Sequence, residues 1–136
     1  MSLVLIGIAA AAATHNVSIN HHGAPIEATY SARVDYRSKT VGAKTPNRMD
    51  MQRCRWSADI QIDRKLNDHA PALTRTIGDE RRLSGSEAGA CVRGDTGERR
   101  IAQHEDAIRA HLMAAAEADR APLLAELDAV RNLAAN

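Results

Sequence analysis

The sequence predicts an α+β fold, in which an antiparallel meander of four to five strands is followed by a C-terminal helical hairpin packed on one face of the sheet. Residues 26–36 and 54–62 alternate between apolar and polar positions, which is typical of strands with one buried face. From about residue 98 the apolar positions recur with a helical period. Strands that precede helices along the chain favour α+β over α/β.

Length and composition suit one domain with an aliphatic core. The chain has 136 residues, 44% of them hydrophobic, and no phenylalanine. Its aromatic residues are Trp56, Tyr30 and Tyr36, so the core depends on Ile, Val, Leu and Ala. The formal net charge of +1 points to no class of partner.

The two strongest strands place their apolar residues at every second position. One face of the first carries Ile26, Ala28, Tyr30, Ala32, Val34 and Tyr36. One face of the second carries Cys54, Trp56, Ala58, Ile60 and Ile62. Polar residues occupy the opposite faces, so we expect each strand to cover a core on one side and to meet water on the other.

The remaining elements have weaker signals. We expect a short strand at 15–20 and a turn at 21–25, where Gly and Pro provide the backbone geometry. The linker 37–52 contains Gly42 and Pro46, with room for an extra strand at 40–43. Two shorter strands, 72–77 and 81–86, are predicted around a turn at Gly78–Asp79, and 86–98 is predicted as loop.

Two helices are predicted at the C-terminal end. Ile101, Ile108, Leu112 and Ala115 share one face of the first helix. Pro122 cannot continue a helix interior but suits a first turn, so a second helix is expected to begin near Ala121. The apolar face of this second helix carries Leu123, Leu127, Val130 and Ala134.

The N-terminal residues 1–14 are predicted to be a signal peptide or an apolar arm, with the domain covering 15–136. The apolar run 3–13 is too short to cross a bilayer, which needs roughly 20 residues, and it resembles the core of a signal peptide. No Lys or Arg precedes it, which departs from that pattern. The alternatives are a buried segment at the edge of the domain and an arm that docks into a neighbouring subunit. We expect a secreted or periplasmic protein.

The two cysteines, Cys54 and Cys91, are predicted to form a disulfide, because an even count in an exported chain favours pairing. The bond would close a loop of about 38 residues, which the chain-entropy model values at roughly 4 kcal/mol. It would fasten the helical segment to the apolar face of the sheet. The alternative is two separate buried thiols.

Three histidines, His15, His21 and His22, are the candidate metal ligands. On a strand, His15 and His21 lie roughly 20 Å apart, too far for one ion. His21 and His22 would point in opposite directions unless the turn twists them together. Cleavage after Ala12 or after Thr14 would place His15 close enough to the new amine to bind copper, whereas cleavage after Ala13, which the small-residue spacing favours, would not. Polar residues around a turn are the simpler interpretation.

A cationic stretch begins at Arg33 and ends at Arg55, with seven basic residues against two acidic ones. We expect Arg33, Arg37, Arg53 and Arg55 to be able to meet an anionic surface. No exposed aromatic residues are interleaved to stack on bases, so nucleic acid is not the expected partner. A solvated sheet face is the alternative.

No catalytic set is visible. There is no Gly-x-Ser-x-Gly motif, no phosphate-binding glycine loop and no carboxylate pair in an apolar setting. We therefore expect a small exported domain with a binding or structural role, whose partner is an unidentified protein or a second copy. The alternatives are a periplasmic copper-binding protein that uses the His15 region and an enzyme whose site is assembled across the fold.

Overall fold

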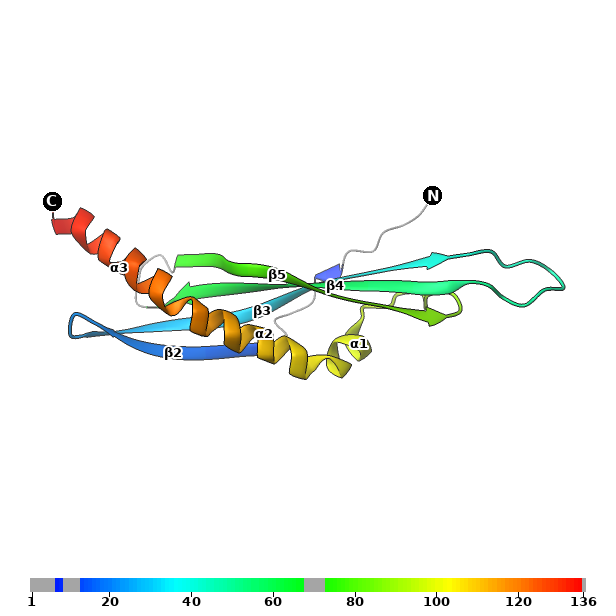
Figure 1. Ribbon diagram of the computed structural model, residues 1–136, viewed down its shortest axis with the longest axis horizontal. Coiled ribbons are helices and arrows are strands. Elements are labelled where there is room, and N and C mark those ends of the chain that lie inside the picture. Colours follow the sequence, from blue (N-terminus) through cyan, green and yellow to red (C-terminus); the bar gives the residue numbers. More distant parts are fainter. Residues whose placement is uncertain (1–6, 9–12, 68–72, 136) are drawn as a thin grey trace.

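A computed structural model describes residues 7–8, 13–67 and 73–135 as a long, twisted sheet crossed on one face by helices (Figure 1). The strands are β1 (Gly7–Ile8), β2 (Ala13–His21), β3 (Ala24–Val41), β4 (Arg53–Leu66) and β5 (Leu73–Ala88). The helices are α1 (Glu98–Gln103), α2 (Glu105–Ala118) and α3 (Arg120–Ala135).

Strands β2 to β5 form the predicted antiparallel meander, because each pairs with the next along the chain. The long β3 pairs with β4 from Ala28 to Val41, and on its other edge it pairs with β2 as far as Ala32. The short β1 pairs with Asp35 and Tyr36 on that same edge. The predicted α+β class is confirmed.

The segment 73–88 is one strand, and the prediction of two strands around a turn at Gly78–Asp79 is wrong. Ile62 pairs with Ile77 and Ile60 pairs with Arg81, so β5 is bulged between these pairs. Gly78 has a φ of +67°, which glycine adopts without strain. A glycine that looks like a turn in the sequence therefore marks a bulge, because β4 continues to pair on both sides of it. The extra strand at 40–43 is also absent: Thr40 and Val41 end β3.

The two long helices follow each other end to end instead of folding back as a hairpin (Figure 1). Only Asp119 separates α2 from α3, and its backbone is helical. Its N–H donates to Ala115 O, and Leu123 N–H donates to Asp119 O, so the helical path continues through the junction. Pro122 lies in the first turn of α3, where a missing N–H is tolerated. The predicted helix boundary is thus correct, while the reversal of the chain is not.

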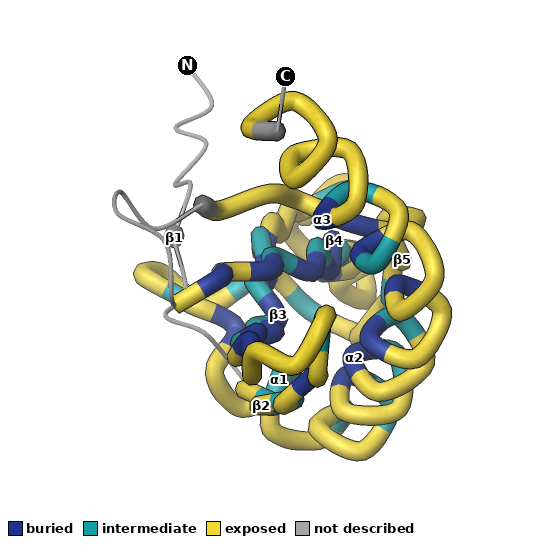
Figure 2. Tube along the Cα trace, turned by 90° about the vertical axis from the view of Figure 1, so that its left-hand side faces the viewer, coloured by how far each residue is buried: buried dark blue, intermediate teal, exposed yellow. Residues whose placement is uncertain are grey.

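The core lies between the sheet and the helices, as the burial pattern in Figure 2 shows. Every apolar residue predicted for the inner faces of β3 and β4 is buried. The helices contribute Ile108, Leu112, Ala116, Leu123 and Leu127. The period-two pattern therefore identified the side of the sheet that the helices cover.

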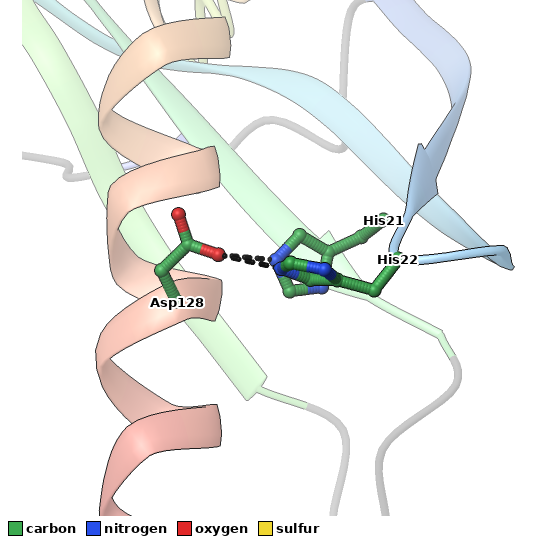
Figure 3. Close-up of side chains that lie close together, drawn as sticks. All are labelled: His21, His22 and Asp128. Carbon is green, nitrogen blue, oxygen red and sulfur yellow. Dashed lines mark hydrogen bonds and ion pairs between the residues drawn. The ribbon is translucent and has the colours of Figure 1, made fainter.

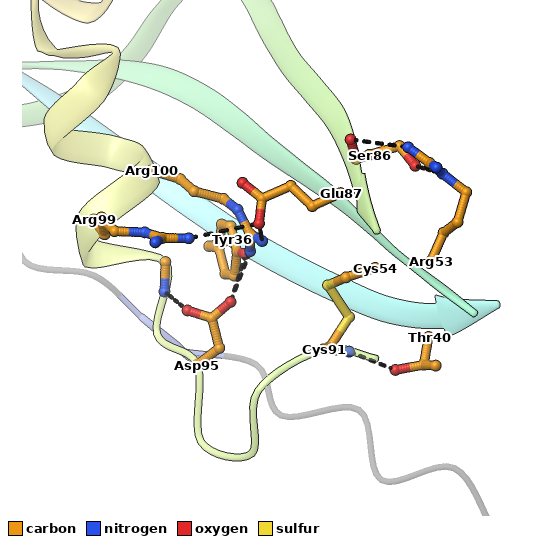
Figure 4. Close-up of polar contacts among 11 residues, drawn as sticks. Tyr36, Thr40, Arg53, Cys54, Ser86, Glu87, Cys91, Asp95, Arg99 and Arg100 are labelled. Atoms are coloured by element: carbon orange, nitrogen blue, oxygen red, sulfur yellow. Dashed lines mark hydrogen bonds and ion pairs between the residues drawn. A yellow bond between two sulfur atoms is a disulfide. The ribbon is translucent and has the colours of Figure 1, made fainter. Parts of the chain in front are cut away.

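The Cys54–Cys91 disulfide is present (Figure 4). Cys54 is buried on the inner face of β4, and Cys91 lies in the loop between β5 and α1. Cys91 N–H also donates to Thr40 Oγ1 at 3.0 Å. The bond therefore joins the segment that leads into the helices to β4, as predicted.

Candidate metal centre

The hairpin that joins β2 to β3 turns in two residues, His22 and Gly23. Both have positive φ, 52° and 82°. Positive φ at both central residues defines the type I′ turn, which matches the twist of the flanking strands. A histidine in the left-handed region is uncommon and carries a conformational cost. This backbone turns the His22 side chain toward that of His21.

Both rings point at Asp128 of α3 (Figure 3). Their Nε2 atoms lie 2.7 Å (His21) and 3.1 Å (His22) from Asp128 Oδ1, and the rings meet edge to face. The side chain of His21 is 12% exposed, whereas those of His22 and Asp128 are 52% and 55% exposed. The cluster is therefore open to solvent on one side and supported by protein on the other.

The position of Asp128 is set by the buried side of α3. Leu123 and Leu127 pack into the core, which directs Asp128 toward the hairpin. Glu126 accepts hydrogen bonds from Arg64 of β4 and Arg75 of β5, tying the same turn of helix to the sheet. The turn of α3 that carries Asp128 is thus held in place by contacts that do not involve the histidines.

A second set of polar contacts fixes the junction between α2 and α3. Asp119 Oδ2 accepts hydrogen bonds from Tyr30 Oη at 2.8 Å and from Arg64 Nη1 at 2.7 Å. Arg64 and Asp119 are only 4% and 8% exposed. Burial, together with the hydrogen bond to Asp119, raises the pKa of Tyr30, so it remains a neutral donor. This buried network holds the start of α3 and thereby the helix that carries Asp128.

The His21, His22 and Asp128 side chains have the chemistry of a metal site. One ligand atom from each lies within 4.8 Å of the others. Metal bonds of about 2.0–2.2 Å place the ligands of a tetrahedral ion about 3.3 Å apart, so small side-chain movements would admit one. Hydrogen bonds from His21 and then His22 lower the pKa of Asp128, which keeps the carboxylate ionised. A bound ion would take the place of the Nε2 protons through which the two imidazoles contact the Asp128 carboxylate.

An open hollow of about 400 Å³ adjoins the cluster. Ile26 and the last turns of α3, including Val130 and Arg131, line it beside the two histidines. Three protein ligands leave at least one position of a metal ion free, and this hollow gives water or a second ligand access to it.

The predicted site residues have different places in the structure. His21 and His22 converge, because the turn twists them together. His15 pairs with Tyr30 further along β2 and lies outside the cluster. Of the two cleavage positions that would give His15 an amine partner, the one after Ala12 borders the residues that are not described, whereas the one after Thr14 lies within β2. Asp128 was missed, because nothing in the sequence links it to a hairpin 106 residues earlier.

The predicted cations all lie on the outer face of the sheet, opposite the buried core. Arg33 contacts Gln61 Oε1 and lies 3.8 Å from Asp63. Arg53 donates to Ser86 Oγ at 2.8 Å. Arg37 and Arg55 are exposed. The four side chains therefore share a face, but Arg33 is neutralised by a neighbour within the sheet.

Comparison with known proteins gives no family, and neither a family model, nor a curated protein, nor a solved structure matches this chain. Within the described residues, the helices are too short or too polar to cross a bilayer. The functional interpretation therefore depends on the site itself.

Proposed function

We propose that this protein is an exported, disulfide-linked domain that binds a divalent first-row transition metal ion through His21, His22 and Asp128. The observation that carries the proposal is the convergence of two imidazoles and one carboxylate from two distant segments. Imidazole nitrogens bind Cu²⁺, Zn²⁺ and Ni²⁺, and the general order of affinity favours Cu²⁺ among them. We therefore expect Cu²⁺ to bind most tightly.

The backbone at the turn supports a role for these side chains beyond closing the hairpin. Asn-Gly and Gly-Gly turns adopt the same geometry with less strain than His22–Gly23. The two imidazoles converge only because His22 takes the left-handed conformation. Strained backbone conformations cluster at binding sites, so the strain at His22 is consistent with a role as a ligand.

Exposure and ligand number favour reversible binding over a structural role for the metal. Structural zinc sites are closed by four protein ligands, whereas this cluster offers three and is open to solvent. The domain also has a disulfide and an apolar core that hold it together without an ion. Capture and release of a metal outside the cytoplasm is the function that this arrangement suits, and the paired cysteines and the apolar run 3–13 support that location.

Calorimetric titration of the full chain with Cu²⁺ and with Zn²⁺ tests the proposal. We expect one ion per chain, with Cu²⁺ bound more tightly than Zn²⁺ and both weakened at acid pH because protons compete for the imidazoles. His21→Ala, His22→Ala and Asp128→Asn should each weaken binding by roughly tenfold or more. His15→Ala is the matched control and should leave the affinity unchanged.

Two results would overturn the proposal. The first is wild-type protein that binds neither ion, in which case the histidines only dock the hairpin on α3. The second is binding that depends on His15 and is indifferent to Asp128→Asn, which would move the site to the N-terminal region.

A further inference from the structure

The far end of the sheet from the hairpin carries a separate charged surface. We call it the ribbon end: residues 37–57 of β3, β4 and their loop, with 84–93 beside them. In Figure 1 this part extends beyond the long helices, with the 42–52 loop at its tip. It is therefore remote from the His21–His22–Asp128 cluster.

The outer face of the ribbon end is cationic, and one of its cations, Arg37, also acts electrostatically on the nearby Asp59 carboxylate. It carries Arg37, Lys39, Arg53 and Arg55, and Lys39 pairs directly with Arg55 across the two strands. Like charges placed opposite each other are destabilising. Among the described residues none of these four cations forms an ion pair. On β5, Arg55 pairs with Ser86 and Arg53 pairs with Ala88, which are uncharged.

The other half of the same face is built differently. Arg82 pairs with Asp59 at 2.6 Å, and Asp63 faces Arg33 at 3.8 Å while accepting a hydrogen bond from Thr76. Acids and bases thus neutralise each other there. The excess of positive charge is confined to the ribbon end.

Exposed apolar side chains lie at this end as well. Met49 and Met51, in the loop at the tip, are 84% and 71% exposed. Val92 is 76% exposed, and it lies at the ribbon end because its neighbour Cys91 is bonded to Cys54. Cations beside exposed apolar side chains are the combination that binds the surface of an anionic bilayer.

We propose that the ribbon end docks on anionic phospholipid bilayers, with Arg37, Lys39, Arg53 and Arg55 at the headgroups and Met49, Met51 and Val92 at the edge of the acyl region. Single-stranded nucleic acid is disfavoured because the nearby rings of Tyr36 and Trp56 are buried on the inner face and cannot stack on bases. A soluble acidic protein is disfavoured as the partner because purely electrostatic binding would make no use of the apolar side chains at the tip. This surface is independent of the metal site.

Vesicle co-sedimentation of the full chain tests the proposal. Wild-type protein should bind vesicles that contain phosphatidylglycerol and phosphatidylcholine, and it should not bind phosphatidylcholine alone. Lys39→Ser with Arg55→Ser should lower the partition coefficient roughly twenty-five-fold, at about fivefold for each cation. Met49→Ser with Met51→Ser should lower it too, including at salt concentrations that screen the charges.

The matched control is Arg109→Ser with Arg120→Ser, which removes the same charge from exposed positions on α2 and α3. It should keep most of the binding, and near-UV circular dichroism checks that each variant is folded. An equal loss in the control would show that only net charge matters and would overturn the proposal. The proposal would also be overturned if the protein did not bind phosphatidylglycerol vesicles. It would likewise be overturned if a short oligonucleotide bound the protein more tightly than the lipid does and released it from the vesicles.

Discussion

Two carboxylates of the C-terminal helical segment, Asp119 and Asp128, bind the sheet in contrasting ways. Asp119 is buried and accepts hydrogen bonds from Tyr30 and Arg64. Asp128 is half exposed and faces two histidines of a strained turn. An arginine keeps its proton at any ordinary pH, whereas an imidazole exchanges its proton readily, also for a metal ion. The Asp119 contact therefore fixes the helix, while the Asp128 contact is exchangeable.

The largest expected effect comes from breaking the fixed contact. Asp119→Ala leaves Arg64 buried with only Glu126 as an acidic partner, and removing one member of a buried pair costs about 3–5 kcal/mol. Urea unfolding followed by the fluorescence of Trp56, the only tryptophan, measures this loss. A loss below about 1 kcal/mol would show that Asp119 is not the anchor of the helix.

The disulfide gives the next largest effect and separates stability from binding. Cys54→Ser with Cys91→Ser should lower the free energy of unfolding by about 2–4 kcal/mol, because the unfolded chain regains the freedom of the closed loop. The metal affinity should not change, since the bond lies at the other end of the sheet (Figures 1 and 4). Urea unfolding and calorimetric titration on the same variant check both parts. A parallel loss of metal affinity would mean that the two ends are coupled.

Acid should weaken a third carboxylate contact by a smaller amount. Burial raises the pKa of Asp95, but hydrogen bonds from Gly97 N–H and Tyr36 Oη and the charge of Arg100 more than offset it, so this pKa lies below the ordinary value of 3.8. The stabilisation is therefore present above pH 3.8 and is lost as the pH falls through the lower folded-state pKa. We expect the free energy of unfolding to fall as the pH drops through this window, and Asp95→Asn should show a weaker dependence of that free energy on pH. If the free energy of unfolding depended equally on pH in wild-type protein and in Asp95→Asn, Asp95 would not be the group that titrates in this window.

The smallest effect on stability is expected at Asp128. In the presence of a chelator, Asp128→Ala should leave the free energy of unfolding nearly unchanged, because the carboxylate is half exposed. With metal at a hundred times its dissociation constant, wild-type protein should gain about 2.7 kcal/mol that the variant lacks. Urea unfolding with and without metal measures both quantities. A large loss in chelator would place Asp128 with Asp119 as a structural anchor.

The sequence revealed the sheet more fully than the site. Alternation in β3 and β4 identified their buried faces, because one face of each strand meets water. Arg64 occupies a position on the buried face of β4. A cation among the apolar residues of that face is the sequence feature that could have indicated a buried acidic partner such as Asp119. The bulge at Gly78 resembled a turn, since glycine adopts positive φ in both. The path of the helices past Pro122 depends on packing against the sheet, which no local pattern encodes.

Of the site, the sequence showed the pair of histidines but not the reason they matter. Adjacent strand residues point to opposite faces, and only the left-handed backbone of His22 brings the two rings together. Asp128 enters the site through tertiary packing of α3, so short-range spacing could not have identified it. These are the two features on which the metal proposal depends.

Electron paramagnetic resonance of the Cu²⁺-loaded full chain tests whether His21 and His22 bind the ion together, because nitrogen couplings count the imidazoles bound to it. We expect two imidazoles in wild-type protein, one in His22→Ala and two in His15→Ala. A spectrum that loses a nitrogen in His15→Ala and is unchanged in His22→Ala would contradict it.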